Sequence, residues 1–113
     1  MHELSLAGGI LGIVEAAAQR EAFTRVRQLH LCVPALAGVE VEALRFALQA
    51  VAPGTVIEGA ELVIDEPAAR ARCAACGGMT EVREQARPCP HCGAYRLQAL
   101  PDGGLRVVDL LVA

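Results

Sequence analysis

The chain has 113 residues, enough for about one ordinary domain or for a modest core joined to a small metal-stabilised module. Hydrophobic residues make up 54% of it but aromatic residues only 3%, so the core must be aliphatic, and extended disorder is disfavoured. The formal charge of -3 argues against nucleic-acid binding, and because all 10 positive residues are arginine, neither a Schiff-base lysine nor a P-loop is present.

The chain starts with Met1-His2-Glu3, which lacks the positive charge of a secretory signal. No apolar run approaches the roughly 20 residues that span a bilayer. We therefore expect a cytoplasmic protein without a membrane segment.

The same start can chelate a metal ion. The α-amine of Met1, the amide nitrogen of His2 and the His2 Nδ1 can close fused rings around one ion, with the Glu3 carboxylate in a fourth position. Nearly coplanar nitrogen donors suit Ni(II) or Cu(II). Because many proteins begin with Met-His, a solvated terminus without ligands is the alternative.

Apolar residues recur at helical spacing in two segments, 4–18 and 39–51. Ser5 is the expected N-cap of the first helix, and Pro53-Gly54 ends the second. The first stripe consists of Leu6, Ile10, Ile13, Val14 and Ala17, and the second of Val41, Leu44, Leu48 and Val51.

Strands are predicted at 26–33, 61–65 and 105–112. The last of these is almost wholly apolar and β-branched, so we expect it in a covered position of a sheet, either central or at an edge. The fold class is therefore α+β: a small three-stranded sheet with two helices, plus an inserted zinc-ribbon-like module. The domain would comprise residues 1–68 and 104–113, and the insertion 69–103.

The insertion carries a C-x2-C-x12-C-x2-C pattern, typical of a closed tetrahedral zinc site with a structural role. The four predicted ligands are Cys73, Cys76, Cys89 and Cys92. Disulfides or a redox-active pair are the alternatives. They are disfavoured because a redox site needs only one such pair, and because Gly77 and Gly93 follow the pairs as zinc knuckles prefer.

Other candidate residues have simpler explanations. Cys32, the fifth cysteine, is expected to be buried in a strand. His30 is expected on a sheet face, and His91 in an exposed turn, although His91 could replace a zinc ligand. Glu40 and Glu42 stand where carboxylates interact favourably with a helix dipole, without catalysis.

A zinc-ribbon module that binds nucleic acid or a transcription complex is the alternative function. Residues 69–103 hold five arginines against three acids, a net +2 that the -2 of a zinc tetrathiolate cancels. Tyr95 alone could stack on a base there. Thiol-disulfide exchange is a second alternative, and it would require zinc-free cysteines.

Several segments together resemble the HypA/HybF family, in order and over essentially the full length. They are Met1–Leu6, Gly38–Glu42 followed by Leu44–Ala47, Gly54–Thr55 to Glu58–Leu62, and the two cysteine pairs. Members are nickel chaperones for maturation of nickel-iron hydrogenase, and in some bacteria they also serve urease.

The resemblance implies a non-enzymatic nickel metallochaperone with a zinc domain inserted before the last strand. It implies nickel binding by Met1, His2 and Glu3, with Glu40 as a further acidic residue near the ion, and zinc binding by the four cysteines. The implied partners are the nickel-handling GTPase of the pathway and the hydrogenase large subunit. We expect no nucleic-acid or membrane partner, and a monomer or homodimer.

Overall fold

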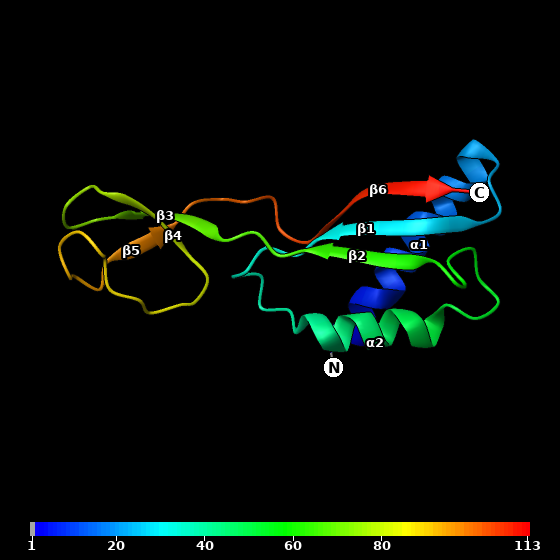
Figure 1. The fold of residues 1–113 in the computed structure, drawn as a ribbon, viewed down its shortest axis with the longest axis horizontal. Helices are drawn as coiled ribbons and strands as arrows, with labels where there is room; N and C mark the ends of the chain where they lie inside the picture. Colours follow the sequence, from blue (N-terminus) through cyan, green and yellow to red (C-terminus); the bar gives the residue numbers. More distant parts are fainter. Residues whose placement is uncertain (1) are drawn as a thin grey trace. The chain divides into compact units, whose positions relative to one another are not determined.

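The computed structural model describes residues 2–113. Eight elements follow one another along the chain: α1 (His2–Glu21), β1 (Val26–Cys32), α2 (Val41–Val51), β2 (Glu61–Asp65), β3 (Ala69–Cys73), β4 (Met79–Val82), β5 (Leu97–Ala99) and β6 (Arg106–Val112). The strands form two three-stranded sheets, ordered β2-β1-β6 and β4-β3-β5 (Figure 1). The predicted α+β class, with two helices and a sheet built from the first, second and last predicted strands, is confirmed.

The chain divides into two compact units. The first unit contains the N-terminal segment up to Leu31 together with 39–64 and 107–113, and the second contains 32–38 and 65–106. Within residues 2–113, no helix is both long enough and apolar enough to cross a membrane.

Helix α1 begins at His2, so the prediction of Ser5 as its N-cap is wrong. The Glu3 carboxylate lies in the first turn, where its charge interacts favourably with the helix dipole and allows an earlier start. Ile13, assigned to the core stripe, is 59% exposed. The buried residues are Ala7, Ile10 and Val14, and Ile13 lies one position, about 100° around the helix, from Val14.

Helix α2 begins two residues later than predicted. Glu40 is its N-cap, with extended backbone angles, and its carboxylate accepts a hydrogen bond from the Glu42 amide at 3.3 Å. On the inner face Leu44 and Leu48 are fully buried. Arg45 donates a hydrogen bond to the carbonyl of Leu62 in β2 at 3.1 Å, which ties α2 to the strand beside it (Figure 1).

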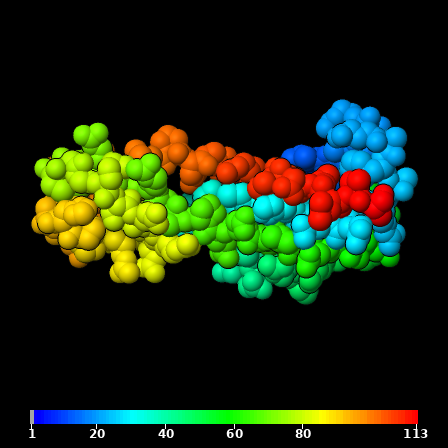
Figure 2. Space-filling view, turned by 45° about the horizontal axis from the view of Figure 1, so that its top comes forward, coloured from blue at the N-terminus to red at the C-terminus, as the bar shows by residue number. Residues whose placement is uncertain are grey.

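Strand β1 is the centre of the first sheet and supplies three of its most buried side chains, Val26, Leu29 and Leu31. Strand β6 is an edge strand, which answers the question of strand order. The expected covered position is wrong: Val108 is 46% exposed and Leu111 55%. Figure 2 shows β6, in red, at the surface alongside β1 in cyan. An edge strand has only one neighbouring strand, so an apolar composition is not enough to bury the side chains of β6.

The second unit is organised around β3, which pairs antiparallel with β4 and with β5. Ala69, Ala71 and Cys73 are buried on one face of β3, and Arg70 and Arg72 point the other way. The segment 32–38 joins this unit through two backbone hydrogen bonds, from Val33 to Asp65 at 2.7 Å and from Ala35 to Pro67 at 2.9 Å. Both bonds join residues of the second unit.

Candidate metal centres

Each cysteine pair of the second unit lies in a tight turn of the same geometry. The amide of Gly77 donates to the carbonyl of Cys73, and that of Gly93 to the carbonyl of Cys89, both at 2.8 Å. Gly77 and Gly93 have φ angles of 74° and 78°, in the left-handed region that glycine adopts without a steric cost. The sequence therefore folds each Cys-x-x-Cys segment so that both sulfurs face the same side.

The two turns bring the four sulfurs together. The Sγ atoms of Cys73 and Cys92 are 3.7 Å apart, as are those of Cys76 and Cys89. All four lie within 4.8 Å of one another. Tetrahedral coordination at about 2.3 Å requires sulfur atoms about 3.8 Å apart, so the donor set fits one zinc ion. The predicted clustering of the four cysteines is confirmed.

Amide groups around the cluster favour ionised sulfurs. The Sγ atoms of Cys73, Cys76 and Cys89 each accept a hydrogen bond at 3.4 Å from the backbone N–H of the residue two positions farther along the chain. Backbone amides, first that of Cys76 and then that of Ala75, together with the neighbouring cysteine side chains lower the pKa of the Cys73 thiol from 9.0 to about 7. For Cys92, the amide of Ala94 favours the thiolate, but burial and the neighbouring cysteine sulfurs raise its pKa to about 11. A divalent cation would offset this repulsion among the sulfurs.

His91 lies outside the thiolate cluster. Its side chain is exposed, and its Nε2 lies 3.1 Å from the carbonyl oxygen of Met79. A Cβ on Gly78 would come within 2.8 Å of the imidazole Cδ2, so only glycine leaves room for this ring position. Cys32, in contrast, is 5% exposed, as expected for a core residue.

The predicted nickel ligands belong to the first unit. Met1 lies outside the described residues. The Nδ1 atom of His2 is 3.3 Å from Oε2 of Glu3, and the His2 side chain is 57% exposed. The same Glu3 oxygen accepts a hydrogen bond from the backbone amide of Glu40 at 3.1 Å. The start of α1 and the start of α2 thus meet at the Glu3 carboxylate.

Sequence reasoning placed Glu40 near this position only through a family resemblance. The contact uses the backbone of Glu40, and no residue pattern signals a hydrogen bond across 37 positions. The amide of Glu40 is the largest cause that lowers the pKa of Glu3 below its ordinary value, followed by the amide of Glu3 itself. The carboxylate is therefore held ionised, in the form that binds a cation.

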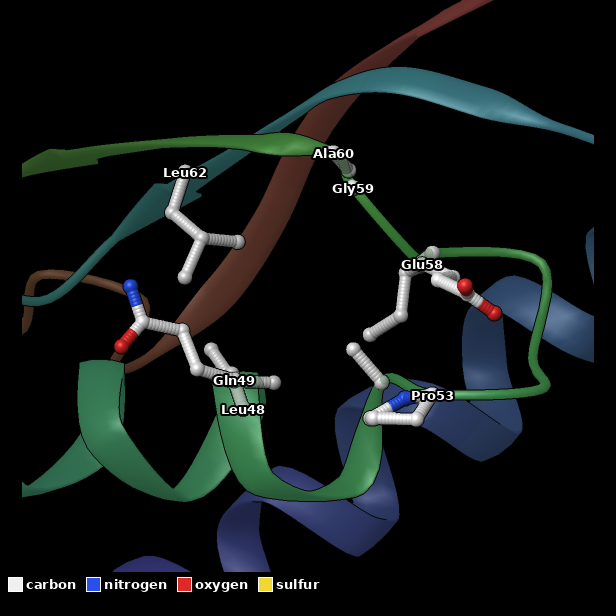
Figure 3. A pocket seen from close by; sticks show the side chains of 9 residues that line it. Leu48, Gln49, Pro53, Glu58, Gly59, Ala60 and Leu62 are labelled. Atoms are coloured by element: carbon white, nitrogen blue, oxygen red, sulfur yellow. The ribbon is translucent and has the colours of Figure 1, made fainter.

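A pocket of about 270 Å³ also opens in the first unit, between the end of α2 and the loop that leads to β2 (Figure 3). Its lining is mainly aliphatic, with Leu48, Pro53 and Leu62 among the residues. Glu58 is the one ionisable lining residue, and its carboxylate accepts the Gly54 amide at 2.6 Å. Such a lining offers no set of metal ligands.

Comparisons with known proteins agree over the whole chain. The family model described as "Hydrogenase/urease nickel incorporation, metallochaperone, hypA" matches residues 1–112. The hydrogenase maturation factor HypA of Polaromonas naphthalenivorans is 56% identical over 115 residues, covering 100% of this chain and 98% of that protein. The HypA of Cupriavidus necator is 54% identical over 112 residues, covering 99% and 94%.

Two solved structures share the fold. The solution structure of the Ni metallochaperone HypA from Helicobacter pylori superposes with a TM-score of 0.66 at 12% identity, covering 97% of this chain and 96% of that one. A second structure, described as a solution structure of HypA protein, has a TM-score of 0.69 at 15% identity, covering 100% and 97%.

Proposed function

Since the chain belongs to the HypA family of nickel metallochaperones in hydrogenase maturation, we propose that it binds Ni(II) at its N-terminus and transfers the ion to a protein partner. This family consists of maturation factors and not of enzymes. Nickel is therefore cargo, bound and then released. A role in urease maturation is the second destination that we propose, because the family description names urease beside hydrogenase.

The observation that carries the proposal is the position of the Glu3 carboxylate, 3.3 Å from the His2 Nδ1. In the proposed site the α-amine of Met1, the amide nitrogen of His2 and Nδ1 supply three nitrogen donors, and Glu3 supplies an oxygen. His2 is the first residue of α1, where amide groups lack an intrahelical acceptor, so its amide nitrogen is free of the helix ladder. Glu40 is the further acidic residue of the site and holds Glu3 through its amide.

Transfer requires that the ion can leave. The proposed donors lie at the end of the chain and, in His2, on an exposed side chain, so a partner can replace them one at a time. Protons compete with the metal for the amine and the imidazole, so nickel affinity should fall as the pH falls.

The second unit has a different role in this proposal. We assign zinc to Cys73, Cys76, Cys89 and Cys92, as a structural ion with no open coordination position. The first unit is then the nickel-binding domain and the second the zinc-binding domain. The partners are a nickel-handling GTPase and a hydrogenase large subunit, and four metal-binding thiols suit a reducing compartment such as the cytoplasm.

Calorimetric titration of Ni(II) into the zinc-loaded protein tests the proposal. The wild-type protein should bind about one nickel ion per chain, if the proposed donors form one site. His2→Ala, and the protein with its N-terminal amine acetylated, should lose this binding because each change removes one nitrogen donor of the fused chelate rings. His91→Ala is the matched control and should bind nickel like the wild type. Equal nickel binding by all four proteins would refute the N-terminal site.

A further inference from the structure

An apolar cleft of about 310 Å³ opens between the first turn of α1 and one side of α2. Its lining residues are Glu3, Leu4, Ala43, Phe46, Ala47 and Ala50. All of them belong to the first unit. Glu3 is also the residue whose carboxylate contacts the His2 Nδ1 and the Glu40 amide, so the cleft borders the proposed nickel ligands.

Two large apolar side chains that line the cleft are exposed to solvent. Phe46 is 73% exposed and Leu4 is 48% exposed. The chain has only two phenylalanines and no tryptophan, and one of these few aromatic rings lies on the surface of a helix. Small alanine side chains between them leave room for an inserted side chain. Exposed apolar residues around a recess are typical of a surface that binds another protein.

Charge indicates what kind of segment fits. The first unit has four arginines against eight carboxylates, which gives a formal charge of -4. Near the cleft, Glu3 lies in the lining and the Glu42 side chain is 79% exposed. The nearest cation on α2 is Arg45, which lies 3.8 Å from Glu42 and donates to the Leu62 carbonyl. The complement is therefore a bulky apolar side chain flanked by lysine or arginine.

We propose that this cleft docks a segment of the protein that exchanges nickel with the chain, and that the segment carries a bulky apolar side chain beside basic residues. The docking rests on the apolar and acidic surface, whereas its use in nickel exchange rests on the function proposed above. A segment seated between Leu4 and Phe46 lies against Glu3. Metal-binding side chains that flank this segment in the partner are then brought close to the proposed nickel site.

The test is an NMR titration of the full-length, zinc-loaded, 15N-labelled protein with a short capped peptide that has a central leucine flanked by lysines. Amide shifts should be confined to residues 3–4 and 43–50. Phe46→Ala should weaken binding about tenfold, as expected for loss of an aromatic anchor. Ile13→Ala is the matched control, because Ile13 is 59% exposed on the same unit but does not line the cleft, and it should bind like the wild type. A peptide with glutamate in place of each lysine should bind at least severalfold more weakly.

Three results would overturn the docking proposal: no shifts in the cleft, equal peptide binding by Phe46→Ala, or equal binding of the glutamate peptide. Self-association that Phe46→Ala abolishes would also overturn it, since a second copy would then be the occupant. Nickel titration separates the two proposals. Phe46→Ala should bind nickel like the wild type when no peptide is present. If His2→Ala also bound nickel like the wild type, the nickel site would be refuted while the docking result stayed unaffected.

Discussion

The two units of the chain are stabilised in different ways. Among the described residues of the first unit, eleven buried hydrophobic side chains, including Leu29, Leu44 and Leu48, pack between two helices and a sheet. In the second unit the buried hydrophobic set is Cys32, Val33, Ala69, Ala71, Cys73 and Cys89. Small side chains bury little apolar surface, so this unit needs an additional source of stability. The first unit is thus stabilised by apolar packing, whereas the second has a small apolar core and four clustered sulfurs whose proposed zinc ion would supply the missing stability.

Loss of one cysteine of the cluster should have the strongest effect, and it should be confined to the second unit. Cys73→Ala removes one of four clustered sulfurs, and apparent zinc binding at such sites supplies on the order of 10–16 kcal/mol at neutral pH. We expect the amide signals of residues 65–106 to collapse to the positions of an unfolded chain, while those of the first unit persist. Cys32→Ala is the matched control and should retain one zinc per chain. An ordered second unit in Cys73→Ala would contradict a folding role for zinc.

The reverse experiment destabilises the first unit alone. Leu48 is fully buried in α2, and Leu48→Ala should lower the free energy of unfolding by about 2–5 kcal/mol. Zinc content measured by atomic absorption should stay at the wild-type level. Simultaneous loss of zinc would show that the two units do not have separate sources of stability.

Replacing glycines in α1 should have a smaller effect, and it tests how far packing, rather than helix propensity, stabilises this helix. Gly8 and Gly9 are exposed, and a Cβ at either position would meet nothing within 4 Å. Gly8→Ala and Gly9→Ala should each raise the free energy of unfolding of the first unit by up to about 1 kcal/mol. Gly54→Ala is the contrasting control, because its φ of 79° is strained for alanine and the substitution should destabilise. Thermal unfolding followed by circular dichroism measures each change.

The weakest effect should be a pH dependence of stability that comes from the start of α1. The folded protein lowers the pKa of Glu3 below its ordinary 4.5, so this carboxylate adds stability above that pH, and the contribution is lost as the pH falls through the folded pKa. Glu3→Gln should therefore reduce the loss of stability on acidification below about pH 4.5 relative to the wild type. The same substitution at exposed Glu15 on α1 is the control. An unchanged acid profile for Glu3→Gln, measured by urea unfolding across pH, would contradict the hydrogen bond from Glu40.

Family membership, inferred from the order of several short segments, is confirmed by the match to residues 1–112. The cysteine cluster could be predicted because each Cys-x-x-Cys turn is local, and two residues between cysteines determine which way the sulfurs face. Helices and strands were also readable, since side-chain periodicity is a property of neighbouring residues. Their ends were harder to predict: α1 begins at His2 and not after Ser5, because the charge of Glu3 in the first turn favours the earlier start.

The sequence alone therefore predicted both helices, the three strands of the first sheet, the cysteine cluster and the family, but not strands β3, β4 and β5 of the second sheet. The tertiary structure decided that β6 lies at a sheet edge, with Leu111 55% exposed in spite of its apolar composition. It also decided that the amide of Glu40 holds Glu3, and that Leu4 and Phe46 share one cleft. These contacts join residues about 40 positions apart, and such pairings follow from how whole helices and strands pack, for which a local pattern carries no signal.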